Sequence, residues 1–178
     1  MSAVGIVLAA GAGTRMGMPK VLVADGEWLR RAVRALSEGG CAEVLVMLGA
    51  AVVEPPKPAR PITVVDWPTG LAATVRAGLV AAEQLPVDMA VFTTVDTPDI
   101  PADAVRRTLH AAGESGVARA SYAGRPGHPV VLSRPHWHAA LQTLAGDVGL
   151  APYLATVDVR IVDCTDLATG ADHDIPVG

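Results

Sequence analysis

Short, continuous apolar runs alternate along this chain with longer segments in which apolar residues recur every three or four positions. The apolar runs predict strands at residues 4–9, 42–48, 62–66, 89–95, 117–122, 128–133 and 157–163. The periodic segments predict helices at residues 27–36, 70–84 and 101–112, and two shorter helices are expected before the last strand. The alternation predicts an α/β fold: one Rossmann-like domain over residues 1–178, with a doubly wound, mostly parallel sheet and flanking helices.

One connection of this pattern lacks a helix. Residues 52–61 hold four prolines, so we expect a loop there rather than a crossover helix.

A glycine-rich loop follows the first predicted strand, in the segment VLAAGAGTRMGMPK at residues 7–20. Ligands of doubly wound sheets bind beyond the carboxyl ends of the strands, and glycines let backbone N–H groups turn toward an anion. The spacing of Gly11, Gly13 and Gly17 fits neither the dinucleotide motif nor the Walker A motif, because Met18-Pro19 precede Lys20. We expect a polyphosphate site; the alternative is a simple glycine turn with incidental charges.

A carboxylate ends the very apolar strand at residues 89–95. Asp96 would lie at the carboxyl edge of the sheet, where a buried charge is costly without a partner. Mg²⁺ bound by one or two carboxylates and by phosphate oxygens is a natural partner. The alternative is a turn or helix-capping aspartate before Pro98.

Composition narrows the class of protein further. The formal net charge of −4 argues against a general nucleic-acid binder, and 51% of the residues are hydrophobic. No apolar run reaches the roughly 18 residues that a membrane-spanning helix needs. The two cysteines, Cys41 and Cys164, match no metal spacing, and the N-terminus lacks the features of a signal peptide. We therefore expect a cytoplasmic protein with a reduced pair of thiols and no membrane partner.

The glycine loop also carries a resemblance to a known family. LAAGAGTRMGMPKVL resembles the signature L-A-A-G-x-x-x-R-M-G-x-x-K of nucleotidyltransferases with a glycosyltransferase-A-like Rossmann fold. Within that group the chain most resembles the molybdenum cofactor cytidylyltransferases and their guanylyltransferase relatives. Further segments resemble family motifs in the same order: DWPTGLAATVRAGL (66–79), TVDTPDIP (94–101), GRPGHPVVLS (124–133), GDVGL (146–150) and DHDIP (172–176).

The resemblance implies transfer of a nucleotidyl group from a nucleoside triphosphate to a phosphate of an acceptor such as molybdopterin, with release of pyrophosphate. It implies catalytic roles for Arg15, Lys20 and Asp96, and a Mg²⁺ site at Asp96 and Asp174, with Asp172 of the same terminal motif as the alternative to Asp174. It places His128 and Asp147 near the acceptor. The nucleotide-binding residues that it implies are Leu8, Ala9, Ala10, Gly11, Gly13, Thr14, Arg15, Lys20, Gly70 and Thr74.

Several alternatives stay open at the level of sequence. The segment LAAG at residues 8–11 resembles the cytidylyl branch of the family rather than the L-A-G-G of the guanylyl branch, and a side chain at Ala10 would narrow the base pocket and favour CTP over GTP. Departures from the family pattern at Ala73-Thr74 and at Ala151-Pro152 leave the identity of the acceptor open. Transfer of a guanylyl group, or transfer to a sugar or isoprenoid phosphate, therefore remains an alternative. Asp147 could instead cap the helix that follows it, and His128 could be a hydrogen-bonded core residue. A catalytically weak nucleotide-binding module is the alternative to an enzyme.

Overall fold

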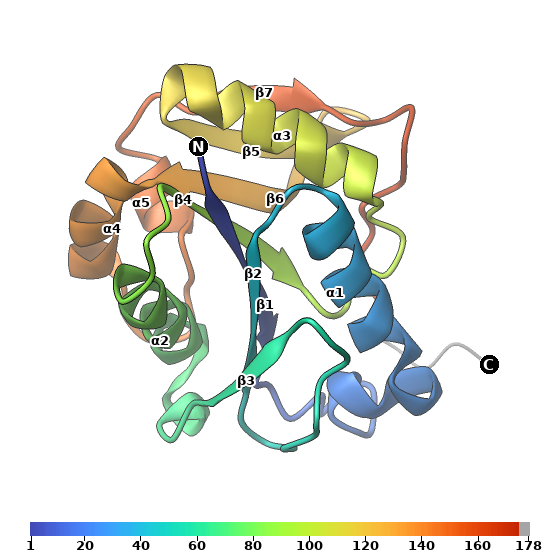
Figure 1. Cartoon of the computed structure of the whole chain (residues 1–178). Coiled ribbons are helices and arrows are strands. Elements are labelled where there is room, and N and C mark those ends of the chain that lie inside the picture. Colours follow the sequence, from blue (N-terminus) through green and yellow to red (C-terminus); the bar gives the residue numbers. More distant parts are fainter. Residues whose placement is uncertain (175–178) are drawn as a thin grey trace.

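The structure is a computed structural model that describes residues 1–174 (Figure 1). Its strands are β1 (Ala3–Ala9), β2 (Glu43–Leu48), β3 (Arg60–Thr63), β4 (Met89–Thr94), β5 (Val117–Tyr122), β6 (Arg125–Ser133) and β7 (Arg160–Asp163). Its α-helices are α1 (Glu27–Glu38), α2 (Leu71–Glu83), α3 (Ala102–Ser115), α4 (Trp137–Thr143) and α5 (Ala151–Leu154). Short 3₁₀ helices cover Lys20–Gly26, Trp67–Thr69 and Arg134–His136.

All seven strands form one sheet in the order β3-β2-β1-β4-β6-β5-β7. β1 pairs in parallel with β2 and β4, β2 with β3, and β5 with β7. Only β6 runs antiparallel, to β4 on one side and to β5 on the other. This confirms the predicted α/β fold with a mostly parallel sheet.

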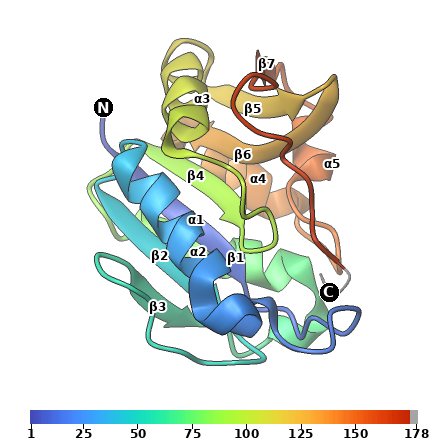
Figure 2. The same ribbon diagram turned by 90° about the vertical axis from the view of Figure 1, so that its right-hand side faces the viewer.

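Helices cover both faces of the sheet (Figures 1 and 2). Buried residues of α1 and α3 pack on one face, and those of α2, α4 and α5 pack on the other. Glycines allow the close approach of helix and sheet. A Cβ at Gly5 would lie 2.8 Å from the Leu36 side chain of α1, and one at Gly78 would lie 2.9 Å from Ile6. These contacts explain why the chain uses small residues in its core.

The boundaries of two strands differ from the prediction. β3 begins at Arg60 and ends at Thr63, earlier than the expected segment 62–66, and β7 covers only the end of the expected segment 157–163. Both are edge strands with mostly exposed side chains, so the apolar pattern marks them poorly. Residues 52–59 contain no helix, as predicted.

Cys41 and Cys164 are buried free thiols. Over residues 1–174, no helix combines the length and the apolar character that crossing a bilayer demands.

Candidate active site

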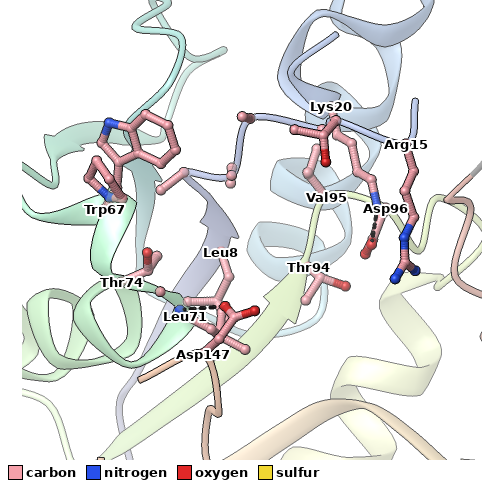
Figure 3. Close-up of a pocket in the computed structure, with 18 of the residues that line it drawn as sticks. Leu8, Arg15, Lys20, Trp67, Leu71, Thr74, Thr94, Val95, Asp96 and Asp147 are labelled. Atoms are coloured by element: carbon pink, nitrogen blue, oxygen red, sulfur yellow. Dashed lines mark hydrogen bonds and ion pairs between the residues drawn. The ribbon is translucent and has the colours of Figure 1, made fainter. Parts of the chain in front are cut away.

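A cavity of about 720 Å³ opens at the carboxyl ends of β1 and β4 (Figure 3). Its walls come from the glycine loop, from the start of α2, from the end of β4 and from two segments near the C-terminus. The lining residues are Leu8–Arg15, Lys20, Trp67–Leu71, Thr74, Thr94–Asp96, Asp147 and Asp174. The predicted site residues therefore come together in one place, apart from His128.

The glycine loop is folded back on itself. The N–H of Gly17 donates to the carbonyl oxygen of Gly13 at 2.9 Å, and the buried side chain of Met16 anchors the loop in the core under α1. Gly13 has a φ of 62°, and a Cβ there would lie 2.0 Å from the carbonyl oxygen of Met18. Only glycine fits this position without moving the backbone.

Lys20 joins two carboxylates from distant parts of the chain. Its ammonium Nζ lies 2.7 Å from Asp96 Oδ2 and 2.5 Å from Asp174 Oδ1. Arg15 is far more exposed, and one of its guanidinium nitrogens lies 3.8 Å from Asp174 Oδ2. Two cations and two carboxylates thus alternate at one rim of the cavity.

These contacts set the charge states of the rim. Burial alone would lower the pKa of Lys20, but hydrogen bonds and charges from Asp174 and Asp96 outweigh it and raise that pKa. The hydrogen bond from Lys20 lowers the pKa of Asp174. Burial, followed by the negative charges of Asp96 and Asp174, raises the pKa of Asp172. Lys20 and Asp174 are therefore charged at neutral pH.

The N-terminus of α2 forms another wall, and a distant loop caps it. The N–H of Leu71 donates to Asp147 Oδ1 at 3.1 Å, and the N–H of Ala72 donates to the carbonyl oxygen of Gly146 at 3.1 Å. A Cβ at Gly70 would lie 2.4 Å from that same oxygen. The idea that Asp147 caps the helix following it is wrong: its carboxylate caps α2, 76 residues earlier.

The segment after β7 crosses back over the sheet and brings Asp174 to the cavity (Figure 2). Asp99 Oδ2 accepts hydrogen bonds from the N–H and the hydroxyl of Thr169. The N–H of His173 donates to the backbone oxygen of Asp96 at 2.9 Å, and its ring lies 5.5 Å from the ring of Trp28. The end of the DHDIP motif, Ile175-Pro176, lies outside the described residues.

With this geometry established, a comparison with family models decides the family. Residues 5–161 match the model of the MobA-like NTP transferase domain. The chain belongs to this family. Its members are nucleotidyltransferases with a glycosyltransferase-A-like fold, so the resemblance found in the sequence is confirmed.

Several solved structures share the fold of this chain. Rv0371c from Mycobacterium tuberculosis H37Rv is 24% identical, with a TM-score of 0.77 over 98% of this chain and 94% of that one. A manganese complex of Rv0371c is 21% identical, with a TM-score of 0.67 over 92% and 88% of the two chains. The 2-C-methyl-D-erythritol 4-phosphate cytidylyltransferase from Thermus thermophilus is 21% identical, with a TM-score of 0.70 over 97% and 94%. A search of curated protein sequences found no match.

In this MobA-like domain, the residues at the rim fit a divalent cation. Asp96 Oδ1 is buried and has no hydrogen-bond partner within residues 1–174, which leaves a carboxylate oxygen free to bind a cation. In that same range, no three His, Cys, Asp or Glu side chains converge as a metal site. Mg²⁺ does not need such a group, because one or two carboxylates suffice when phosphates and water supply the other ligands.

His128 lies apart from the cavity lining. It is half-buried in β6, and its backbone oxygen accepts a hydrogen bond of 2.6 Å from the Tyr122 hydroxyl. Burial and the nearby Arg119 cation lower the pKa of His128 to about 4, against a smaller opposite effect of Asp96. The imidazole is therefore neutral at pH 7.

Several lining residues of the MobA-like site were missed in the sequence. Trp67 and Leu71 flank Gly70 at the start of α2, and Thr94 and Val95 end β4 (Figure 3). The signal for them was their position: each lies inside a segment that resembles a family motif, 66–79 or 94–101.

Proposed function

We propose that this domain transfers a nucleotidyl group from a nucleoside triphosphate, with CTP preferred over GTP, to a phosphate of an acceptor such as molybdopterin. Pyrophosphate is the leaving group. The observation that carries the proposal is the rim where Lys20 meets Asp96 and Asp174, directly beside the glycine loop. Family membership supports the reaction class, and the rim supplies the charges that this reaction needs.

The cavity has two chemically different ends (Figure 3). Trp67, Leu71 and Thr74 lie at one end, beside the Asp147 carboxylate that caps α2; this end has no cation among its lining residues and suits a base and a ribose. Arg15, Lys20 and Asp96 lie at the other end and suit a triphosphate. A nucleotide would therefore lie across the carboxyl ends of β1 and β4, with its phosphates on the glycine loop.

At the charged end, Lys20 and Arg15 would bind the β- and γ-phosphates together with backbone N–H groups of the loop. Lys20 is already held in place by its two carboxylates, and together these donors would stabilise the negative charge that grows on the departing pyrophosphate. The glycine turn at Gly13 holds the loop in the shape that brings them together.

Asp96 and Asp174 would hold Mg²⁺, with Asp96 Oδ1 as the available oxygen. When bound, Mg²⁺ supplies neutralisation of phosphate charge and orientation of the α-phosphate. The manganese complex of Rv0371c, a protein of similar fold, supports a divalent cation in this family. Asp147, beside the start of α2, and His128, in β6, would lie toward the acceptor.

The preference for CTP rests on Ala10. Its side chain is buried at the wall of the cavity, and its backbone oxygen accepts a hydrogen bond of 2.9 Å from the N–H of Ala50. This bond holds the backbone of Ala10 in place. A fixed methyl group at this point leaves less room for a purine. The Thermus thermophilus cytidylyltransferase of similar fold supports this choice.

The decisive experiment has two parts. Thermal shift with each of four nucleoside triphosphates and Mg²⁺ should give the largest stabilisation with CTP, since a ligand stabilises according to its affinity for the folded state. Pyrophosphate release should then require both CTP and a phosphorylated acceptor, with molybdopterin tested first. Equal shifts with all four nucleotides would overturn the CTP preference. Nucleotide binding without release of pyrophosphate from the triphosphate in the presence of any of the acceptors named above would instead indicate a binding module.

A further inference from the structure

Arg119, in the middle of β5, is a cation without a carboxylate partner. Among the described residues, no Asp or Glu oxygen lies within ion-pair distance of its guanidinium. Its Nε donates to the backbone oxygen of Gly127 at 3.0 Å, and the side chain is half-buried. Most other arginines of the chain lie at exposed positions, so this one is unusual.

The position of Arg119 in the sheet places it on the face that carries the cavity. Arg119 lies opposite Val130 of β6, and Val130 lies opposite Phe92 of β4. Side chains alternate between the faces of a sheet, so Arg119 and Thr94 belong to the face of Val130 and Phe92. Thr94 lines the nucleotide cavity. The charges of Arg119 and of Asp96, a residue of the cavity lining, both act on the pKa of His128, which places His128 near both the cavity and Arg119.

This part of the face is open. Ile161 of β7 pairs in register with Arg119, so it shares its face, and it is 54% exposed. The helices that cover this face, α2, α4 and α5, therefore do not extend over the β5–β7 end. Arg119 itself is only half-buried, and among the described residues its two terminal guanidinium nitrogens donate no hydrogen bond.

The charges around Arg119 favour an anion. Burial lowers its pKa, yet a guanidinium remains protonated at any pH that a protein tolerates. The neighbouring His128 is neutral at pH 7, so it neither competes for an anion nor supplies a counter-charge. A half-buried positive charge without a partner is costly, and a bound phosphate would relieve that cost through paired N–H···O bonds.

We propose that Arg119 binds an anionic group of the acceptor, a phosphate monoester, on the open sheet face beyond His128. This inference rests on the proposed function and adds a residue that no motif marked. It divides the site into a nucleotide half around Lys20 and an acceptor half around Arg119, with His128 and Thr94 between them.

The test uses inorganic phosphate as the probe, in the presence of saturating MgCTP so that the nucleotide half is filled. The ring C–H resonance of His128, assigned by its loss in His128→Gln, reports on anions near Arg119. Phosphate should shift this resonance in the wild-type protein. Arg119→Met keeps most of the side-chain volume but no charge, and it should weaken the phosphate response about tenfold or more. Arg119→Lys keeps the charge without the planar fork and should give an intermediate response.

Arg160→Ala is the matched control, because it removes an exposed arginine from the adjacent strand β7 and should leave the response unchanged. With the true acceptor, Arg119→Met should raise the KM for the acceptor and leave the KM for CTP unchanged. A wild-type phosphate response in both Arg119 variants would overturn the proposal. If MgCTP stabilises none of the proteins, the proposed function is overturned instead. Phosphate is then titrated without MgCTP, and the response of Arg119→Met relative to the wild type still tests whether Arg119 binds phosphate.

Discussion

Lys20 shows how one side chain can organise charges that come from three parts of the sequence. It is one of only two lysines in the chain, and both of its carboxylate partners lie more than 70 residues away. Without it, Asp96 and Asp174 would face one another with no cation between them except the exposed Arg15. The residue therefore has both an electrostatic role in the free protein and a proposed role on phosphate.

Replacing Lys20 with alanine should lower turnover about 100-fold or more, the usual scale for the loss of one donor that stabilises developing charge. Steady-state pyrophosphate release measures this. Stability should also fall, because the mostly buried Asp96 loses its ion-pair partner, so turnover is compared per folded molecule. Lys57→Ala removes the other lysine, outside the cavity, and should behave as wild type. A Lys20→Ala protein with normal turnover per folded molecule would refute the phosphate role.

The low pKa of His128 makes a second prediction at this scale. Its folded-state pKa of about 4 lies below the ordinary value of 6.5, so between these pH values the unfolded chain binds more protons than the native one. Stability should therefore fall as pH falls from about 6.5 to about 4. Urea denaturation at several pH values should show a flatter profile in this window for His128→Gln. His138→Gln, which replaces an exposed histidine, serves as control. A pH profile of stability in His128→Gln equal to that of the wild type would contradict the lowered pKa of His128.

At the scale of elements, the start of α2 depends on a loop from the other half of the chain. The carboxylate of Asp147 and the backbone oxygen of Gly146 accept the N–H groups of Leu71 and Ala72. Because Asp147 also lines the cavity, the cap and the nucleotide wall are one structure.

Asp147→Ala should lower the free energy of unfolding by about 1 kcal/mol, which is typical for the loss of a helix cap. It should also weaken the thermal shift with MgCTP. Asp147→Asn keeps an acceptor oxygen and should lose less stability. Asp158→Ala removes an exposed aspartate outside the cavity lining and should change neither quantity. Chemical denaturation of the four proteins decides, and equal stability of wild type and Asp147→Ala would show that the cap contributes nothing.

The sequence predicts most elements well, because buried strands and amphipathic helices leave clear periodic patterns. It fails at the edges: β3 contains Arg60 and Pro61, and β7 is mostly exposed, so neither shows a continuous apolar run. The glycine loop could be predicted because its chemistry lies within a short stretch. The cap from Asp147 and the isolated charge of Arg119 could not, because each depends on contacts between distant segments.

At the scale of the whole molecule, the chain runs from the sheet edge at β7 back to the centre at β4. This return path places Asp174 beside Asp96, with Asp99 and Trp28 as contacts along the way. The site is therefore complete only when the segment after β7 is docked.

If Asp96 and Asp174 act as one unit, Asp96→Asn and Asp174→Asn should each lose most Mg²⁺-dependent turnover. The double variant should be barely worse than either single one, because residues that act together have strongly non-additive effects. Turnover as a function of Mg²⁺ concentration measures this for all four proteins. Wild-type turnover in Asp174→Asn would show that the segment after β7 takes no part in the reaction. Asp96 would then be the one carboxylate of this pair left as a proposed Mg²⁺ ligand.

The ammonium of Lys20 between two carboxylates has a consequence for the order in which ligands arrive. A free divalent ion must displace or share this ammonium, so the protein alone should hold such ions weakly, and chelators should not unfold it. A triphosphate offers Lys20 new acceptors and leaves the carboxylates to the ion. Each ligand should then raise the affinity for the other by the same factor, as reciprocal coupling requires. Calorimetric titrations with each ligand alone and then together would reveal an enzyme that takes up nucleotide and metal as a pair.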